Sequence, residues 1–166
     1  MAIEIERRFL VKGEEWRNHA GPPQPLRQGY LTSSLQGWTV RVRILNQQAS
    51  WLTLKSRKSD IAKYEFEYLI PLEDAESLWL LAPHKVLKTR YELILNSTQW
   101  IVDCFEGENA PLRLAEVELQ SASQEIIIPA WCVKEITGEN IWSNAALAKA
   151  PITSWPIELR QRNLLN

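Results

Sequence analysis

The stretch that decides the fold is residues 3–11, which read Ile-Glu-Ile-Glu-Arg-Arg-Phe-Leu-Val. Apolar residues fall at alternate positions on one face of an extended chain, and Glu4, Glu6 and Arg8 fall on the other. Successive side chains of a strand point to opposite sides, so this period of two predicts a β-strand, here over residues 2–11. One of its faces is apolar, and the other carries charge.

The same period recurs along the chain and predicts further strands. They cover residues 26–32, 38–45, 49–56, 63–70, 85–95, 99–105 and 112–120. One helix is predicted over 73–81, with short helices near 14–19, 123–127 and 141–149, and the tail from Pro151 has no strong pattern. Short connections between strands predict one domain over residues 1–166 of mainly β (α+β) class, with an antiparallel sheet that is closed or strongly curved.

Composition excludes several classes of partner. The 166 residues carry a formal net charge of -1, which gives no general attraction to nucleic acid or to an anionic membrane. No apolar run is long enough to span a bilayer or to act as a signal peptide. Cys104 and Cys132 lack motif spacing, which favours free thiols over a disulfide. We therefore expect a cytoplasmic protein, and the sequence carries no signal for an oligomeric state.

Five strands carry pairs of like charge on one face. The pairs are Glu4 and Glu6, Arg41 and Arg43, Glu65 and Glu67, Lys88 and Arg90, and Glu116 and Glu118. Residues two apart on a strand are about 6.6 Å apart, so each pair repels by roughly 0.6 kcal/mol in water and roughly 2.5 kcal/mol at an effective dielectric of 20. Two arrangements relieve this: an open sheet with its charges in solvent, or a barrel whose lumen binds ions. The apolar faces need cover from helices, which favours the lumen.

The residue types indicate phosphate chemistry with a metal. Clustered carboxylates are hard oxygen ligands that suit Mg²⁺ or Mn²⁺, and arginine and lysine bind phosphate oxygens. His19 and His84 are isolated, which argues against zinc and against a catalytic triad. No phosphate-binding loop of the form G-x-x-x-x-G-K-[ST] occurs.

A series of motifs resembles the CYTH domain, the triphosphate tunnel metalloenzyme family. The first is Glu4-Ile5-Glu6-Arg7-Arg8, which is similar to the E-x-E-x-K opening strand. The resemblance spans about residues 4–147, and only the ordered set is specific. The later motifs, in family order, are 26–31 (LRQGYL), 40–43 (VRVR), 52–56 (LTLKS), 65–67 (EFE), 88–91 (KTRY), 103–107 (DCFEG), 115–118 (AEVE) and 134–138 (KEITG).

The resemblance implies an eight-stranded antiparallel β-barrel tunnel with a few short helices packed outside. It implies metal ligation by Glu4, Glu6, Glu116 and Glu118. Glu65 and Glu67 would bind the metal through water or orient the attacking water. Asp103 is added to the expected metal-binding residues. Phosphates would be bound by Arg8, Arg41, Arg43, Lys55, Lys63, Arg90 and Lys134. Tyr30 and Lys88 match a pair that activates water in small bacterial members, since a nearby lysine eases deprotonation of a phenol.

Three positions depart from the family pattern. Arg8 replaces a lysine, and because arginine keeps its proton it can bind phosphate but cannot act as an acid or base. Lys63 stands where arginine is expected and binds phosphate with a less rigid geometry. Val133 stands where glycine is expected, before Lys134-Glu135.

The resulting hypothesis is a small bacterial-type inorganic triphosphatase, a metal-dependent enzyme whose partner is a small-molecule triphosphate. Two alternatives stay open. One keeps the fold but makes the chain an adenylate cyclase or a nucleoside or thiamine triphosphatase. The other is a non-catalytic polyphosphate- or nucleotide-binding module, for which Arg8 is the only support in the sequence.

Overall fold

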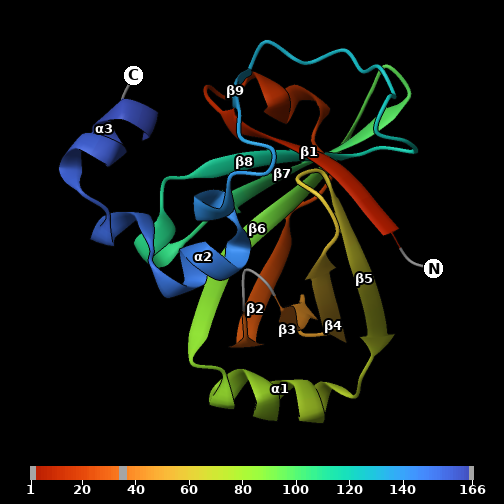
Figure 1. The fold of residues 1–166 in the computed structure, drawn as a ribbon, viewed down its shortest axis with the longest axis vertical. Coiled ribbons are helices and arrows are strands. Elements are labelled where there is room, and N and C mark those ends of the chain that lie inside the picture. The colour runs from red at the N-terminus through yellow and green to blue at the C-terminus, as the bar shows by residue number, and fades with distance from the viewer. Residues whose placement is uncertain (1–2, 34–36, 165–166) are drawn as a thin grey trace.

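The computed structural model describes residues 3–33 and 37–164, and in that part of the chain eight antiparallel strands close into a barrel (Figure 1). Around the barrel the order is β1-β8-β7-β6-β2-β3-β4-β5, and β5 pairs with β1 to complete it. The bounds are β1 Ile3–Val11, β2 Gln24–Thr32, β3 Trp38–Leu45, β4 Ala49–Arg57, β5 Ala62–Leu69, β6 His84–Leu95, β7 Thr98–Phe105 and β8 Arg113–Glu118. The predicted barrel is confirmed.

Strand β1 joins the most distant parts of the chain. Its first residues pair with β5, its middle pairs with β8, and its end pairs with a ninth strand, β9 (Cys132–Glu135). In this register Glu6 lies opposite Glu118 and Arg8 lies opposite Glu116, so the charged face of β1 and that of β8 coincide. The alternation seen in the sequence therefore sets one continuous charged surface inside the barrel.

Helix α1 (Leu72–Leu81) covers the outside of the barrel below β2, β3 and β4 (Figure 1). Its Ala75 packs against Val42 and Ile44, which are the outward residues of β3. Gly29 of β2 lies under the end of this helix, where a Cβ atom would come within 2.8 Å of the Ala82 Cβ. A glycine is needed there because α1 approaches the strand so closely.

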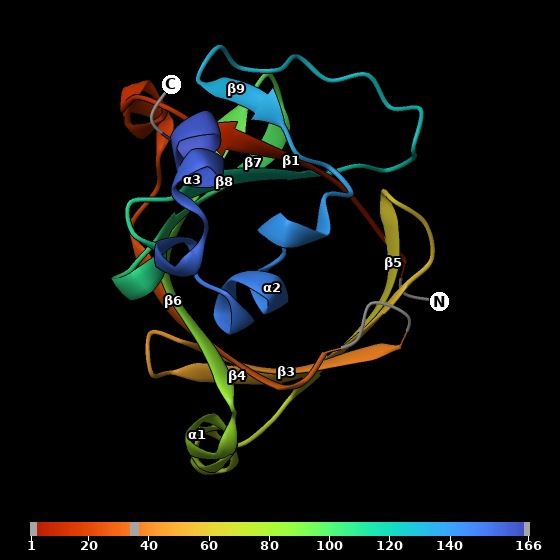
Figure 2. The ribbon, with the colours of Figure 1, turned by 60° about the vertical axis from the view of Figure 1, so that its left-hand side comes forward.

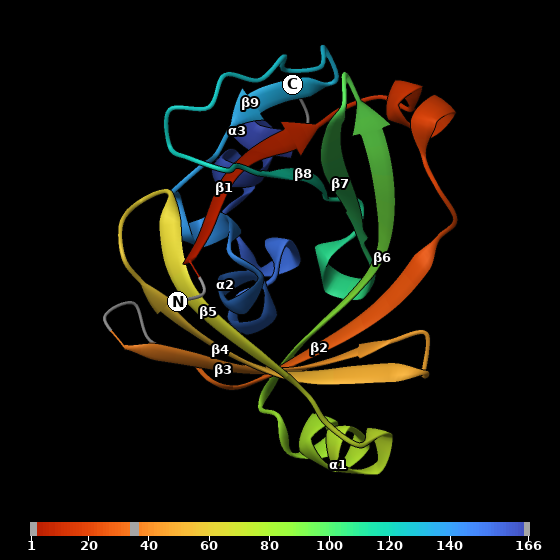
Figure 3. The ribbon, with the colours of Figure 1, turned by 90° about the vertical axis from the view of Figure 1, so that its right-hand side faces the viewer.

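Helix α2 (Asn144–Lys149) lies inside the ring of strands rather than outside it (Figures 2 and 3). Its Leu147 is fully buried in a cluster with the inward side chains of Leu10, Phe105 and Leu114. The expected packing of short helices outside the barrel therefore holds for α1, whereas α2 packs against the inner face. The inner face of the strands changes from charged to apolar near this helix, and an apolar helix surface can bury only there.

The remaining elements follow the prediction less closely. The short segment near 14–19 is a 3-10 helix, η1 (Glu15–His19), and the predicted helix at 141–149 is split into η3 (Asn140–Trp142) and α2. The helix predicted near 123–127 is wrong: this segment is irregular. Strand β9 and the C-terminal helix α3 (Ile157–Leu164) were not predicted, nor were the 3-10 turns η2 (Gly107–Asn109) and η4 (Ile152–Ser154).

Replacing Leu147 by alanine tests the inner position of α2. We expect Leu147→Ala to lower the free energy of unfolding by about 2–5 kcal/mol, because the lost side chain leaves a cavity among buried neighbours. The control Leu80→Ala removes a leucine of α1 that is 75% exposed, and a change within about 0.5 kcal/mol is expected for it. Urea unfolding measures both, and equal small losses would contradict the packing of α2 inside the barrel.

Candidate functional site

The lumen of the barrel contains a cavity of about 410 Å³, whose lining includes charged residues of β1, β3, β4, β5, β6 and β8 and part of α2. Basic side chains outnumber acidic ones in its lining, so the lining carries a net positive charge inside a protein of nearly neutral charge. The basic residues are Arg8, Arg41, Arg43, Lys55, Arg57, Lys63, Lys88, Arg90 and Lys149. The acidic residues are Glu4, Glu6, Asp60, Glu65, Glu116 and Glu139.

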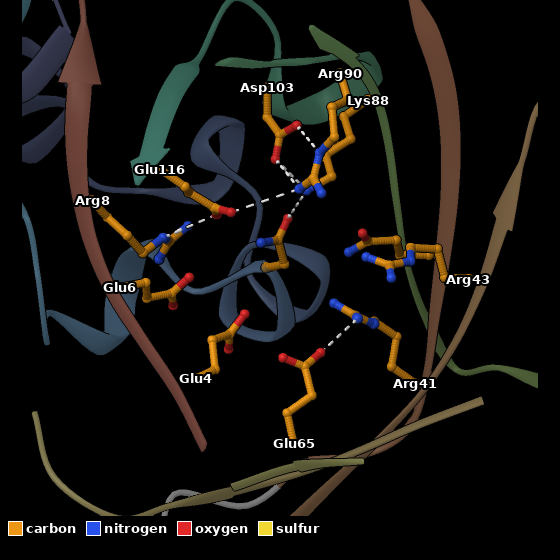
Figure 4. Close-up of polar contacts among 12 residues, drawn as sticks. Glu4, Glu6, Arg8, Arg41, Arg43, Glu65, Lys88, Arg90, Asp103 and Glu116 are labelled. Atoms are coloured by element: carbon orange, nitrogen blue, oxygen red, sulfur yellow. Dashed lines mark hydrogen bonds and ion pairs between the residues drawn. The ribbon is translucent and has the colours of Figure 1, made fainter. Parts of the chain in front are cut away.

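One side of the cavity is formed by β1 and β8, where carboxylates alternate with Arg8 (Figure 4). The Arg8 Nε donates to Glu116 Oε1 at 3.2 Å; Arg8 is buried and Glu116 is partly buried. Burial alone would raise the pKa of Glu116, but the Arg8 guanidinium holds that pKa well below its usual range. Glu116 is therefore a fixed negative charge at neutral pH.

Glu118 has the opposite electrostatic environment. Burial, followed by the nearby carboxylates of Glu4 and Glu6, raises its pKa above the usual range. Three carboxylates are thus close enough to repel one another, and added positive charge would relieve this repulsion.

Lysines from β4 and β5 partly neutralise the same carboxylates. Lys55 Nζ lies 2.7 Å from Glu4 Oε2 and 3.2 Å from Glu65 Oε2, and Lys63 Nζ lies 2.6 Å from Glu6 Oε1. Within residues 3–33 and 37–164, no three acidic, histidine or cysteine side chains stand in a ready-made metal cage. The donor set nonetheless fits a hard divalent cation, because it consists of carboxylates that repel one another, and lysine side chains are long and mobile.

Two arginines of β3 share one carboxylate of β5. Arg41 Nη2 donates to Glu67 Oε1 at 3.1 Å, and Arg43 Nη2 donates to the same oxygen at 2.6 Å. Burial, and then the charge of Arg41, lowers the pKa of Arg43 to about 10, so it remains a cation at neutral pH. Both arginines face the cavity, whereas Glu67 is not part of its described lining.

Asp103 of β7 holds two cations of β6 in place (Figure 4). Lys88 Nζ donates to Asp103 Oδ2 at 2.5 Å, and Arg90 forms a two-pronged pair with it at 2.8 and 2.9 Å. Burial lowers the pKa of Lys88 to about 8, although Asp103 opposes that shift. With both oxygens engaged and 1% of its side chain exposed, Asp103 is placed to orient Lys88 and Arg90. Its predicted role as a metal ligand stays a prediction.

Lys88 and Tyr30, the predicted water-activating pair, have separate partners. Besides Asp103, Lys88 Nζ binds Asn144 Oδ1 of α2 at 3.1 Å. The Tyr30 hydroxyl accepts a hydrogen bond from Gln28 Nε2 at 3.0 Å. No hydrogen bond among the described residues joins Tyr30 to Lys88. Burial raises the pKa of Tyr30, so its hydroxyl is neutral at neutral pH.

Most of the predicted site residues meet at this cavity. Those that line it are Glu4, Glu6, Arg8, Tyr30, Arg41, Arg43, Lys55, Lys63, Glu65, Lys88, Arg90 and Glu116. Glu67, Asp103 and Glu118 contact or influence lining residues from outside the described lining. Lys134 is exposed and bonds Asn163 of α3 at 3.0 Å, away from the others.

Sequence reasoning missed Asn144 and Gln28. Gln28 shares a strand face with Tyr30, and this alternation was a signal that could have identified it. Asn144 follows Ser143, which caps α2 by accepting from the Ala146 backbone N–H at 3.1 Å. Serine is a common helix cap, but nothing in the sequence shows that α2 enters the lumen.

None of the described helices is both long and apolar enough to cross a membrane.

A closed antiparallel barrel with carboxylates and cations facing its lumen defines a class of ion-binding tunnel proteins. The chain belongs to the CYTH domain family, which it matches over residues 2–144. It is similar to the inorganic triphosphatase of Acetivibrio thermocellus (34% identity, covering 91% of this chain and 96% of that protein). It is also similar to the inorganic triphosphatase of Nitrosomonas europaea (39% identity, 87% and 96%).

The fold has a match among solved structures. The crystal structure of the inorganic triphosphatase NE1496 superposes with a TM-score of 0.61 at 35% identity, and the match covers 92% of this chain and 99% of that one. The membership in the CYTH family implies a divalent metal cofactor.

Removing the negative charge of Asp103 tests the role of this residue in the charged lumen. We expect Asp103→Asn to lower the free energy of unfolding by about 3–5 kcal/mol, because it leaves buried cations without their counter-charge. The control Asp60→Asn disrupts an ion pair whose carboxylate side chain is 80% exposed, and about 0–1 kcal/mol is expected for it. Denaturant unfolding measures both, and a loss for Asp103→Asn no larger than the control would disprove the role.

Proposed function

We propose that this protein hydrolyses inorganic triphosphate to pyrophosphate and phosphate with a divalent metal. The proposal draws on the names of its relatives, on the size of the cavity and on its cationic lining. A phosphoanhydride substrate suits such a site, because catalysis of phosphoryl transfer is mainly positioning and charge neutralisation. We also propose a cytoplasmic location, which the free thiols of Cys104 and Cys132 support.

The observation that carries the proposal is a pair of buried arginine nitrogens in the cavity. Arg8 Nη2 and Arg41 Nε are inaccessible to solvent and have no hydrogen-bond partner among the described residues. Both side chains line the lumen, and both are more than nine-tenths buried. A buried cationic donor without an acceptor is unfavourable, so an anion with several oxygens would stabilise both.

Binding would exchange partners across the cavity. Phosphate oxygens can replace the carboxylates that now pair with Arg43, Lys55 and Lys63. The carboxylates released by this exchange, Glu4 and Glu6 among them, then become available to a cation. Substrate and metal therefore favour each other's binding in this site.

Glu4, Glu6 and Glu118 would hold the metal, with Glu65 and Glu116 near enough to contribute. Mg²⁺ or Mn²⁺ suits an all-carboxylate set. When bound, such an ion neutralises phosphate charge and orients water for attack.

In hydrolysis, a water oxygen bonds to the terminal phosphorus, the bridging P–O bond breaks, and pyrophosphate leaves. Lys88 and Arg90, held by Asp103, would neutralise the leaving group or the transferred phosphate. Glu65 lines the cavity and would orient the water and accept its proton. Tyr30 is neutral, so we assign its contribution to hydrogen bonding.

A substrate panel tests the reaction. With Mg²⁺ or Mn²⁺ we expect phosphate release from tripolyphosphate in preference to ATP and thiamine triphosphate, because the described lining is charged and polar and offers one aromatic side chain, Tyr30, to stack on a base. Phosphate release and nucleotide products are measured in parallel. Faster turnover of ATP, or a cyclic nucleotide product, would refute the substrate assignment, and binding without any product would refute catalysis.

Neutral replacements of carboxylates test the metal site. We expect Glu6→Gln and Glu118→Gln each to weaken metal activation by about 10- to 100-fold or more. Mutation of a residue that only hydrogen-bonds to a metal ligand already causes a loss of this size, so mutation of a ligand should cause at least as much. The control Glu92→Gln changes an exposed carboxylate of β6 outside the described cavity lining. Metal dependence of phosphate release is the readout, and unchanged activation constants in both variants would rule out the ligand set.

A further inference from the structure

Gln28 and Tyr30 form a buried polar pair on the inner face of β2. The exposed fraction of Gln28 is 0% and that of Tyr30 is 3%. The Gln28 Nε2 donates to the Tyr30 hydroxyl oxygen at 3.0 Å. Because the two residues are two positions apart on a strand, they point to the same side, and Gly29 between them faces α1.

The two ends of the Gln28 amide differ in their hydrogen-bond partners among the described side chains. Its Oε1 is buried and accepts no hydrogen bond from any described residue, while its Nε2 serves the phenol of Tyr30. A buried amide oxygen without a partner is unfavourable, and a methionine or leucine of similar size would avoid that cost. The geometry therefore points to the donor end of the amide as the reason for a glutamine here.

The donor end constrains the direction of the Tyr30 O–H bond. Gln28 occupies an acceptor position of the phenolic oxygen, so the hydroxyl proton must point elsewhere. Tyr30 lines the cavity, and the cations Arg41 and Lys55 lie on the neighbouring wall. The carboxylates on that wall, Glu4 and Glu65, already pair with Lys55 and Arg41, so an oxygen of a bound anion is the further acceptor that the hydroxyl can meet in the lumen.

We propose that Gln28 is a positioning residue that orients the Tyr30 hydroxyl to donate a hydrogen bond to an oxygen of the bound triphosphate. This inference rests on the proposed function and makes Tyr30 a donor rather than a base. The proton stays on Tyr30, so no group transfer through this residue is needed.

A double-mutant cycle tests the coupling between the two residues. Gln28→Met, Tyr30→Phe and the double variant are compared by kcat and KM for tripolyphosphate, and by calorimetric binding of tripolyphosphate in EDTA, which stops turnover. Each single variant is expected to weaken binding by roughly 10- to 100-fold, the size of one hydrogen bond to a charged group. The double variant is expected to be no worse than Tyr30→Phe alone, because Gln28 acts only through Tyr30.

Two further variants keep the test decisive. Gln28→Leu removes the same donor with a different apolar shape, so it should lose as much as Gln28→Met and lose nothing more in the Tyr30→Phe background. Gln99→Met, at an exposed position of β7, is the matched control and should leave both constants unchanged.

Additive losses would overturn the proposal, because they would show that Gln28 matters for folding or packing independently of Tyr30. They would do so even if the wild-type chain is a good triphosphatase. A wild-type chain that binds tripolyphosphate without hydrolysing it would refute the proposed function and leave the binding cycle decisive for Gln28. Absence of any binding would overturn both.

Discussion

A closed barrel limits the contact of its inward side chains with bulk water, so most charges in the lumen are paired with one another. Asp103 meets this constraint for Lys88 and Arg90, and Lys55 meets it for Glu4 and Glu65. The like-charged pairs of single strands are tolerable because the register places strands of opposite sign next to one another. The protein without ligand is thus largely self-neutralised, with an excess of cations left in the lining.

The same constraint links the two ligands of the proposed reaction. An anion that pairs with Lys55 and Lys63 removes the counter-charge of Glu4 and Glu6, so it raises the affinity of these carboxylates for a cation. A divalent cation bound there has the converse effect on the lysines. Metal and triphosphate are then coupled through the protein's own ion pairs, in addition to any direct contact between them.

Alternation predicted the strands because it is a local property that each strand displays by itself, whereas closure into a barrel was implied by the family resemblance. The sequence could not predict what depends on distant contacts. Residues 126–128 are consecutive isoleucines, but Pro129 follows and the segment is irregular. Strand β9 has only four residues, too few to show a period, and it exists because the end of β1 has an edge to pair with. The inner position of α2 depends on the change from charged to apolar residues at one end of the lumen.

The site shows the same contrast, because alternation indicates which way a side chain points but not which partners it meets. Alternation identified which side chains face inward, but Asp103 and Glu116 are both inward carboxylates and only pairing distinguishes them. The partners of Arg8 could be seen only in the structure. Its Nε is fixed by Glu116, while its Nη2 remains buried without a partner at the cavity. A guanidinium can hold a carboxylate with one nitrogen and a phosphate with another, whereas a lysine has a single nitrogen for both. Under the proposed function, an arginine at this position would bind a phosphate without releasing Glu116.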